Sequence, residues 1–228
     1  MTAAKICGLV RPADAAAAAA AGARYVGAIL AGGPRLVTVS QARAVFEAAA
    51  TATRVVVVGH EPVDDIVRAG MTAGADIIQL HGDPSPRLVA ELRERWPGGI
   101  WAVLRVPSGA FDLERAGALF AVADGVVLDA LVPGALGGTG VAIDWRTLQV
   151  PLQALRAAPD CTALLVLAGG LTAENVRTGI RLLAPDVVDV SSGVESLPGV
   201  KDRSRVTRFI AAARGDGEDE QLTLAGVQ

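Results

Sequence analysis

Short, nearly continuous runs of hydrophobic residues recur about eight times along the chain. They cover residues 5–7, 25–30, 55–58, 77–80, 101–106, 125–128, 164–167 and 187–190. The runs do not alternate between hydrophobic and polar positions. Continuous hydrophobicity of this kind is typical of parallel strands that are buried on both faces of a sheet.

Between most of these runs lie stretches with the length and composition of helices. They cover residues 14–22, 40–50, 64–73, 85–96, 112–123, 145–157, 172–183 and 204–213. Thr38, Ser40 and Thr172 are residue types that favour the start of a helix. A strict alternation of strand and helix predicts an α/β fold with a parallel sheet, and eight such units in 228 residues favour closure into a barrel. We therefore expect a single (β/α)8 TIM barrel over residues 1–214, followed by an acidic, mobile tail over residues 215–228.

Composition and charge narrow the range of partners. The formal net charge is −3 and the isoelectric point is about 5.4, which gives no general attraction to nucleic acid or to an anionic membrane. The alanine run from Ala15 to Ala21 is too short to span a bilayer, and the N-terminus lacks the pattern of a secretory signal. We expect a cytoplasmic protein that binds a small molecule.

The active site of such a barrel lies where the C-terminal ends of the strands meet the following loops. Gly169 and Gly170 follow the seventh run, and Ser191, Ser192 and Gly193 follow the eighth. Barrels often bind phosphate with the loops after strands 7 and 8, through backbone N–H groups. These five residues are therefore candidate phosphate ligands, although the glycines would also suit tight turns.

Two further residues at strand ends carry chemistry. Cys7 ends the first run, where a thiolate would act as a base or nucleophile, although a buried cysteine is more often a small hydrophobic residue. Asp129 follows the sixth run, where a partly desolvated carboxyl would act as a general acid. A helix cap, or a salt bridge from Asp129 to Arg35 or Lys5, is the structural alternative. Cys161, the other cysteine, precedes a strand at the opposite rim and is expected to be inert.

Arg35 and His81 also lie at the expected barrel mouth. A guanidinium at position 35 is suited to binding a substrate carboxylate, and His81 would hydrogen-bond to substrate or support the thiol. The glycine-rich stretch 133–140 follows Asp129, and we interpret it as a mobile lid over that residue. It lacks the Lys-Ser/Thr of a P-loop and the glycine spacing of a dinucleotide-binding loop, so we do not expect it to bind a nucleotide. The two cysteines do not have the spacing of a zinc site or of a redox pair.

Several short motifs occur together in a specific order. They are Lys5-Ile6-Cys7-Gly8-Leu9, Pro34-Arg35, Gln79-Leu80-His81-Gly82, Leu128-Asp129-Ala130, Gly137-Gly138-Thr139-Gly140 with Asp144-Trp145, Leu167-Ala168-Gly169-Gly170-Leu171, and Val188 to Glu195 with Pro198-Gly199-Val200-Lys201-Asp202. In this combination, from Lys5 to about Phe209, the chain resembles the phosphoribosylanthranilate isomerases of tryptophan biosynthesis.

The resemblance implies a reaction and roles for individual residues. The family converts N-(5-phosphoribosyl)anthranilate to 1-(2-carboxyphenylamino)-1-deoxyribulose 5-phosphate in an Amadori rearrangement, without metal or cofactor. By resemblance, Asp129 protonates the ring oxygen as general acid and Cys7 removes the C2 proton of the Schiff-base intermediate. Arg35 would meet the anthranilate carboxylate, with His81 and Asp189 as secondary contacts.

The chain also departs from the family pattern. Gly33 stands where the family usually has a serine before Pro-Arg, the stretch 28–30 lacks an aromatic residue, and His60 replaces the usual asparagine. These changes leave open a difference in substrate specificity. A histidine-pathway sugar isomerase would carry a carboxylate in place of Cys7, and an aldolase or epimerase would need lysines or metal-binding histidines at the strand ends. A catalytically silent phosphate-binding barrel is the alternative from another class.

Overall fold

Eight parallel strands close into a barrel in the computed structural model, which describes residues 1–106, 111–130 and 145–215. The barrel strands are β1 (Ala3–Ile6), β2 (Tyr25–Ile29), β3 (Thr53–Val58), β4 (Ile77–Leu80), β5 (Gly99–Val106), β6 (Gly125–Ala130), β7 (Leu164–Leu167) and β8 (Val187–Val190). Each strand pairs with the next, and β8 pairs with β1. The predicted (β/α)8 barrel is confirmed.

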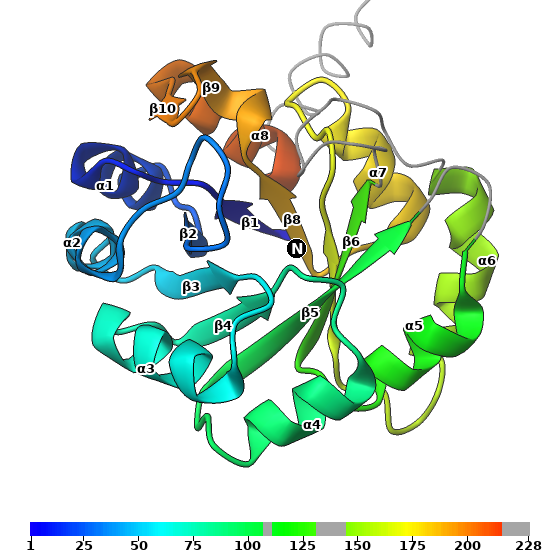
Figure 1. Ribbon diagram of the computed structural model, residues 1–228. Coiled ribbons are helices and arrows are strands. Elements are labelled where there is room, and N and C mark those ends of the chain that lie inside the picture. The colour runs from blue at the N-terminus through cyan, green and yellow to red at the C-terminus, as the bar shows by residue number, and fades with distance from the viewer. Residues whose placement is uncertain (107–110, 131–144, 216–228) are drawn as a thin grey trace, which may run out of the picture.

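Helices form an outer ring around the strands (Figure 1). They are α1 (Pro12–Ala20), α2 (Val39–Ala48), α3 (Val63–Ala73), α4 (Pro86–Arg93), α5 (Leu113–Phe120), α6 (Trp145–Arg156), α7 (Val176–Leu183) and α8 (Arg203–Arg214). Thr38 caps α2 as expected and shares a capping box with Gln41, so the helix begins before Ser40. The expected cap at Thr172 is wrong, because Thr172 and Asn175 are held in a turn that delays α7 to Val176.

The hydrophobic core has two parts, because each strand shows one face to the helices and the other to the barrel interior. The larger part lies between strands and helices. The smaller part fills the barrel and includes Val55, Trp101, Val103, Val127 and Val166. This inner core fills the barrel with side chains, as is usual for this fold.

Three aspartates at the N-terminal rim of the barrel make the same set of contacts. Asp76, Asp124 and Asp186 precede β4, β6 and β8, and each carboxylate accepts a backbone N–H from the preceding strand. Each also binds an arginine. The three pairs are Arg54–Asp76, Arg93–Asp124 and Arg156–Asp186. These contacts link successive strands on the face of the barrel opposite the expected active site.

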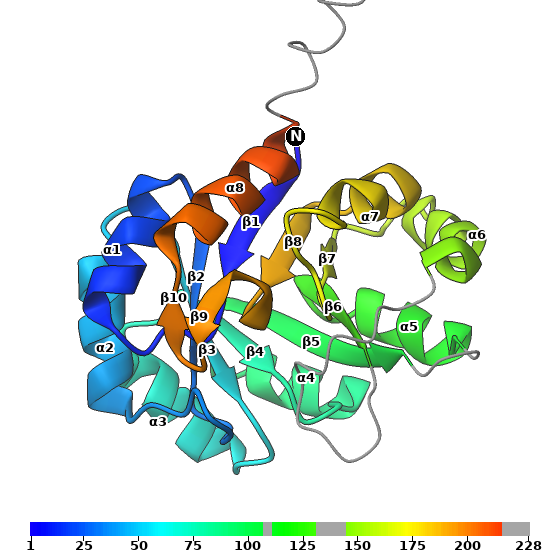
Figure 2. The same ribbon diagram turned by 90° about the horizontal axis from the view of Figure 1, so that it is seen from above.

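A small hairpin follows β8 and was not predicted from the sequence. The chain passes through the 3-10 turn η1 (Ser192–Val194) into antiparallel strands β9 (Glu195–Leu197) and β10 (Val200–Lys201), and then into α8. Figure 2 shows the N-terminus next to the end of α8. The backbone N–H of Lys201 donates to Asp14 of α1, which fixes the hairpin against the barrel.

Candidate active site

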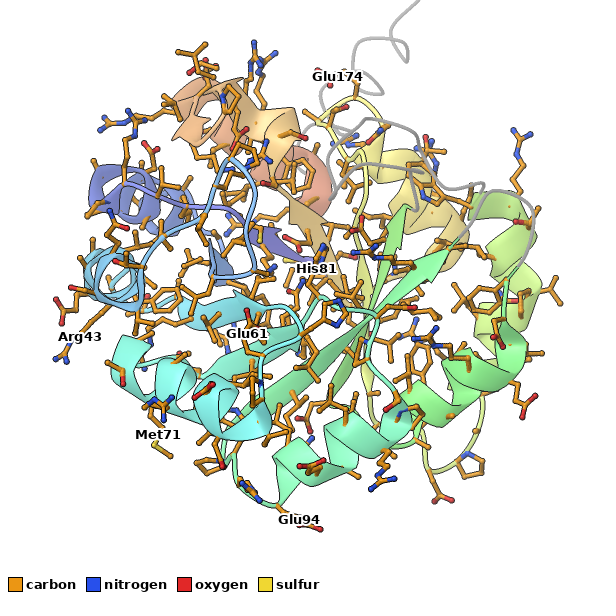
Figure 3. The ribbon with its side chains drawn as sticks, in the orientation of Figure 1. Arg43, Glu61, Met71, His81, Glu94 and Glu174 are labelled. Carbon is orange, nitrogen blue, oxygen red and sulfur yellow. The ribbon has the colours of Figure 1, made fainter. Side chains whose placement is uncertain are left out.

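One pocket at the C-terminal ends of the strands brings together every site residue predicted from the sequence. Its lining includes Cys7, Arg35, His81, Asp129, Gly169, Gly170, Asp189, Ser191, Ser192 and Gly193. These residues come from six of the eight strand ends, and they meet because a closed barrel turns all its C-terminal ends to one side. In Figure 3, His81 lies near the centre of the ring, whereas Arg43, Met71 and Glu94 lie at its periphery.

Cys7 lies directly after β1, and its backbone N–H donates to the carbonyl of Val190 at 2.8 Å. The side chain is buried at the pocket wall. Gly27 of β2 makes room for it, because a Cβ at that position would lie only 2.9 Å from the sulfur. Burial raises the pKa of the thiol, while the nearby ammonium groups of Lys5 and Lys201 oppose that rise. The apolar surroundings of the thiol and the positive charges near it therefore have opposite effects on its pKa.

A buried polar cluster lies beneath Cys7 inside the barrel. The Lys5 ammonium donates to Asp189 Oδ2 at 2.7 Å and to Gln79 Oε1 at 2.9 Å. All three side chains are buried. Asp189 Oδ1 is also buried and has no hydrogen-bond partner within the part of the chain that the structure describes. Asp189 therefore neutralises Lys5 with one oxygen and keeps the other as an acceptor next to the pocket.

Asp129 lies in β6, where its register partner on β5 is Arg105. The side chain is half-buried and lines the pocket. Arg35 and Lys5, the two cations considered from sequence as its salt-bridge partners, form ion pairs with Glu195 and Asp189. Asp129 and Cys7 are carried by strands that are not neighbours in the barrel, so they reach the pocket from different sides.

The loops after β7 and β8 approach each other very closely. A Cβ on Gly193 would lie 2.0 Å from the carbonyl oxygen of Leu171, so only glycine fits there. Gly169 and Gly170 have φ values of 88° and 65°, in the left-handed region that glycine adopts without strain. The Ser191 hydroxyl is buried and has no hydrogen-bond partner in the described residues. The two loops form a cradle of small residues at one end of the pocket.

Arg35 is held by the hairpin at the other side of this cradle. Its Nε and Nη2 donate to the two carboxylate oxygens of Glu195 at 2.8 and 2.7 Å. Lys201 Nζ donates to the same carboxylate at 2.8 Å and to the carbonyl of Ser191 at 3.0 Å. The bidentate pair uses two of the five N–H groups of the guanidinium. Arg35 is therefore fixed in orientation while it lines the pocket.

Comparisons with known proteins agree on one family. The family model described as N-(5'phosphoribosyl)anthranilate (PRA) isomerase matches residues 4–212. The chain belongs to the PRA isomerase family. The isomerase of Acidithiobacillus ferrooxidans is 39% identical over 213 residues, which cover 92% of this chain and 97% of that protein.

Solved PRA isomerases have the same fold. A structure of monomers of the dimeric enzyme from Thermotoga maritima superposes with a TM-score of 0.80 at 31% identity, covering 94% of this chain and 100% of that one. A PRA isomerase in complex with reduced 1-(o-carboxyphenylamino)-1-deoxyribulose 5-phosphate gives a TM-score of 0.79 at 30% identity, with 94% and 100% coverage. The predicted family and the predicted enzyme class, an aldose–ketose isomerase of tryptophan biosynthesis, are confirmed.

Four buried polar residues in or next to the pocket were not recognised from the sequence as important. Lys5 was considered only as a salt-bridge partner of Asp129, Gln79 was quoted only within a motif, and Glu195 and Lys201 were given no role. The sequence did contain one signal for Lys5. Residues i and i+2 of a strand share a face, so a Cys7 side chain that points into the barrel places the Lys5 side chain on the same inner face. No sequence signal shows that Glu195 binds Arg35, since the two are 160 positions apart.

Some expectations lie outside the residues that the structure describes. These are the lid over residues 133–140 and the tail beyond Gly215. Within the described residues, no helix is long and apolar enough to cross a membrane. The same residues contain no cluster of three or more side chains of the kinds that bind metal ions.

His81 is half-buried in the pocket. Desolvation lowers its pKa, and the positive charges of Arg105 and Lys5 lower it further. A neutral imidazole can both donate and accept a hydrogen bond, unlike the imidazolium. His60, which departs from the family pattern, lies against Gly82, where a Cβ would be 2.6 Å from its ring. Gly82 directly follows His81, so a change at position 60 would act on substrate specificity through the loop that carries His81.

We expect Glu195→Gln to lower the free energy of unfolding at pH 7 by about 3 kcal/mol, because two cations would lose the buried carboxylate between them. Burial alone would raise the Glu195 pKa, but the bonds from Arg35 and Lys201 hold it below the ordinary value of 4.5. The stabilisation is therefore complete above that value and is lost as the pH falls through the lower, folded-state pKa.

Urea unfolding at pH 7 and again below pH 4.5 checks this prediction. The difference between wild type and Glu195→Gln should shrink at the acidic pH. Glu94→Gln, a change of the same chemistry at an exposed position, is the control and should alter stability little at either pH. An equal loss for Glu195→Gln at both pH values would contradict the account.

Proposed function

We propose that this chain isomerises N-(5-phosphoribosyl)anthranilate by general acid–base catalysis, with Asp129 as the acid and Cys7 as the base. The observation that carries the proposal is the single pocket in which both residues lie with all the predicted phosphate-loop residues. A carboxyl and a thiol on separate strands can act on different atoms of one bound sugar. Residues 1–214 would form the catalytic unit.

In the first step, Asp129 gives its proton to the ribose ring oxygen. The C1–O bond then breaks, and the anthranilate nitrogen lone pair forms the C=N bond of a protonated Schiff base. In the second step, the Cys7 thiolate removes the C2 proton, and the C–H electron pair neutralises the iminium to give an enolamine. Tautomerisation of the enolamine gives the 2-ketone product. The two residues must begin in opposite protonation states, Asp129 protonated and Cys7 ionised.

The glycine- and serine-rich cradle suits the 5-phosphate. Backbone N–H groups of Gly169, Gly170, Ser192 and Gly193 are the proposed donors, because small residues let an anion approach the backbone closely. The buried Ser191 hydroxyl, which lacks a partner among the described residues, would add a further hydrogen bond. Lys201 holds this loop through the Ser191 carbonyl and places positive charge behind it.

The remaining polar groups suit the rest of the substrate. We assign the anthranilate carboxylate to Arg35, through the N–H groups that do not bond to Glu195. Asp189 Oδ1 would accept a hydrogen bond from a sugar hydroxyl, and neutral His81 would supply another contact. We further propose that the protein acts in the cytoplasm, as a monomer or a homodimer, without metal or cofactor.

A direct assay tests the proposed function. N-(5-phosphoribosyl)anthranilate is formed in situ from anthranilate, and its conversion by the purified wild-type chain is followed as a loss of fluorescence, with and without a chelator. We expect turnover that does not depend on added metal. No turnover together with tight binding of a phosphorylated product analogue would instead indicate a catalytically silent phosphate-binding barrel.

A further inference from the structure

Lys5 is a fully buried lysine within the catalytic barrel, with 0% of its surface exposed. It lies on β1 two residues before Cys7, so both side chains turn toward the barrel interior. Two of its three N–H groups donate to Asp189 and Gln79. The ammonium is therefore fixed in one place, between the apolar inner core and the pocket.

A buried ion pair at this position is not needed to fill the barrel. Well-packed hydrophobic residues of similar volume are often as stabilising as a buried ion pair, or more so. The other residues of the inner core are apolar, including Val55, Val103 and Val166. A lysine and an aspartate at the top of this core, directly beneath the pocket, thus point to a role in the chemistry above them.

The Lys5 side chain is packed beside the sulfur of Cys7. Both flank Gly27, where a Cβ would lie 2.9 Å from the sulfur and 3.2 Å from Lys5 Cε. Gly27 thereby lets the two side chains share one space. Burial by itself lowers the pKa of Lys5, but attraction to Asp189 and Cys7 outweighs it and places the pKa above the ordinary value. Lys5 therefore remains an ammonium ion.

We propose that Lys5 is a positioning residue that stabilises the thiolate form of Cys7 against the effect of burial, and that Asp189 and Gln79 hold its ammonium next to that sulfur. The inference rests on the proposed role of Cys7 as base. Lys5 transfers no proton itself. Cys7 loses its thiol proton before the isomerisation begins, and its sulfur then receives the C2 proton of the substrate. The Lys5 ammonium keeps its charge throughout.

Other charged groups also act on Cys7, and each comes from a different element. Lys201 of β10 lowers the pKa of the thiol and Asp189 of β8 raises it, while Arg35 also interacts with the sulfur. His81, which follows β4, and Asp129 of β6 line the same pocket. Lys5 is the largest of the influences that oppose the effect of burial. Its removal should therefore change the ionisation of Cys7 more than the loss of the others.

Thiol titration tests the proposal without relying on isomerase activity. In a Cys161→Ala background Cys7 is the only cysteine, and its alkylation by iodoacetamide is followed as a function of pH. We expect Lys5→Met to raise the midpoint of the alkylation profile by about one unit or more, the usual effect of losing an adjacent opposite charge. Gln79→Met removes one of the two acceptors that hold the ammonium but leaves its charge in place, and should shift the midpoint less than Lys5→Met.

Lys5→Met leaves Asp189 buried without its partner, so its folding is checked by circular dichroism. A second comparison, between two variants that both lack the Asp189 charge, tests the proposal independently. The Lys5→Met/Asp189→Asn double variant is compared with Asp189→Asn alone, and the midpoint should again be higher without Lys5. An unchanged midpoint in both comparisons would overturn the proposal. The acidic limb of the kcat/KM profile should move in parallel in any active variant.

The two proposals fail in different experiments. Full activity of Cys7→Ala would show that Cys7 is not the base. The proposed role of Lys5, which is to stabilise the Cys7 thiolate, would then also be lost. An unshifted Cys7 titration in variants without Lys5 would remove only the role of Lys5.

Discussion

Replacement of Cys7 by alanine is expected to lower kcat by about 10³-fold, within the range of 10² to 10⁴ for the loss of a general acid or base. Alanine keeps the small apolar volume of the side chain but offers no group to take the C2 proton. KM should change little, because the sulfur acts in the transition state and contributes little to ground-state binding. Initial rates over a range of substrate concentrations separate the two constants.

Cys161→Ala is the matched control, since it removes the only other cysteine of the chain, which lies outside the pocket. It should retain near-normal activity. Binding of reduced 1-(o-carboxyphenylamino)-1-deoxyribulose 5-phosphate to Cys7→Ala should remain close to that of the wild type. Near-normal turnover of Cys7→Ala would exclude the thiol as the base.

The pH dependence of the wild type follows from the same thiol. Burial raises the Cys7 pKa above the ordinary value of 9.0, and the base must be ionised to act. The kcat/KM should therefore rise with pH through that pKa, whereas Cys7→Ala should lack this limb. The raised pKa also explains why positive charge close to the sulfur matters for catalysis at neutral pH.

The barrel could be predicted from sequence because its strands are buried on both faces and have no competing pattern. Residues 164–167 and 187–190 were assigned without error as the strands β7 and β8. Helix starts were less accurate, since side chains such as Thr172 bond locally and form turns before the helix. The β9–β10 hairpin was missed because five strand residues carry too short a pattern to detect.

The site could be predicted in part for a similar reason. Residues at the ends of strands are found by their position along the chain, and every one selected in this way lines the pocket. Contacts between distant segments are not encoded in local pattern. The Lys5–Asp189 pair joins residues 184 positions apart, and only barrel closure between β1 and β8 brings them into register.

Replacement of Asp129 by asparagine should be as severe as loss of the thiol, with kcat lowered by about 10² to 10⁴-fold. Asparagine preserves the shape of the side chain but has no acidic proton to give to the ring oxygen. Without that proton the departing oxygen must leave as an alkoxide, so ring opening becomes the slow step. The Schiff base on which Cys7 acts would then form too slowly to support turnover.

Asp160→Asn, the same change at an exposed loop position, provides the control and should leave the rate unchanged. Affinity of Asp129→Asn for the reduced product analogue should stay close to that of the wild type, because phosphate and carboxylate are assigned to other residues. Loss of affinity in proportion to the loss of rate would make Asp129 a binding residue. Retained affinity with lost turnover is the result that a general acid requires, since a proton donor stabilises the transition state far more than the bound substrate.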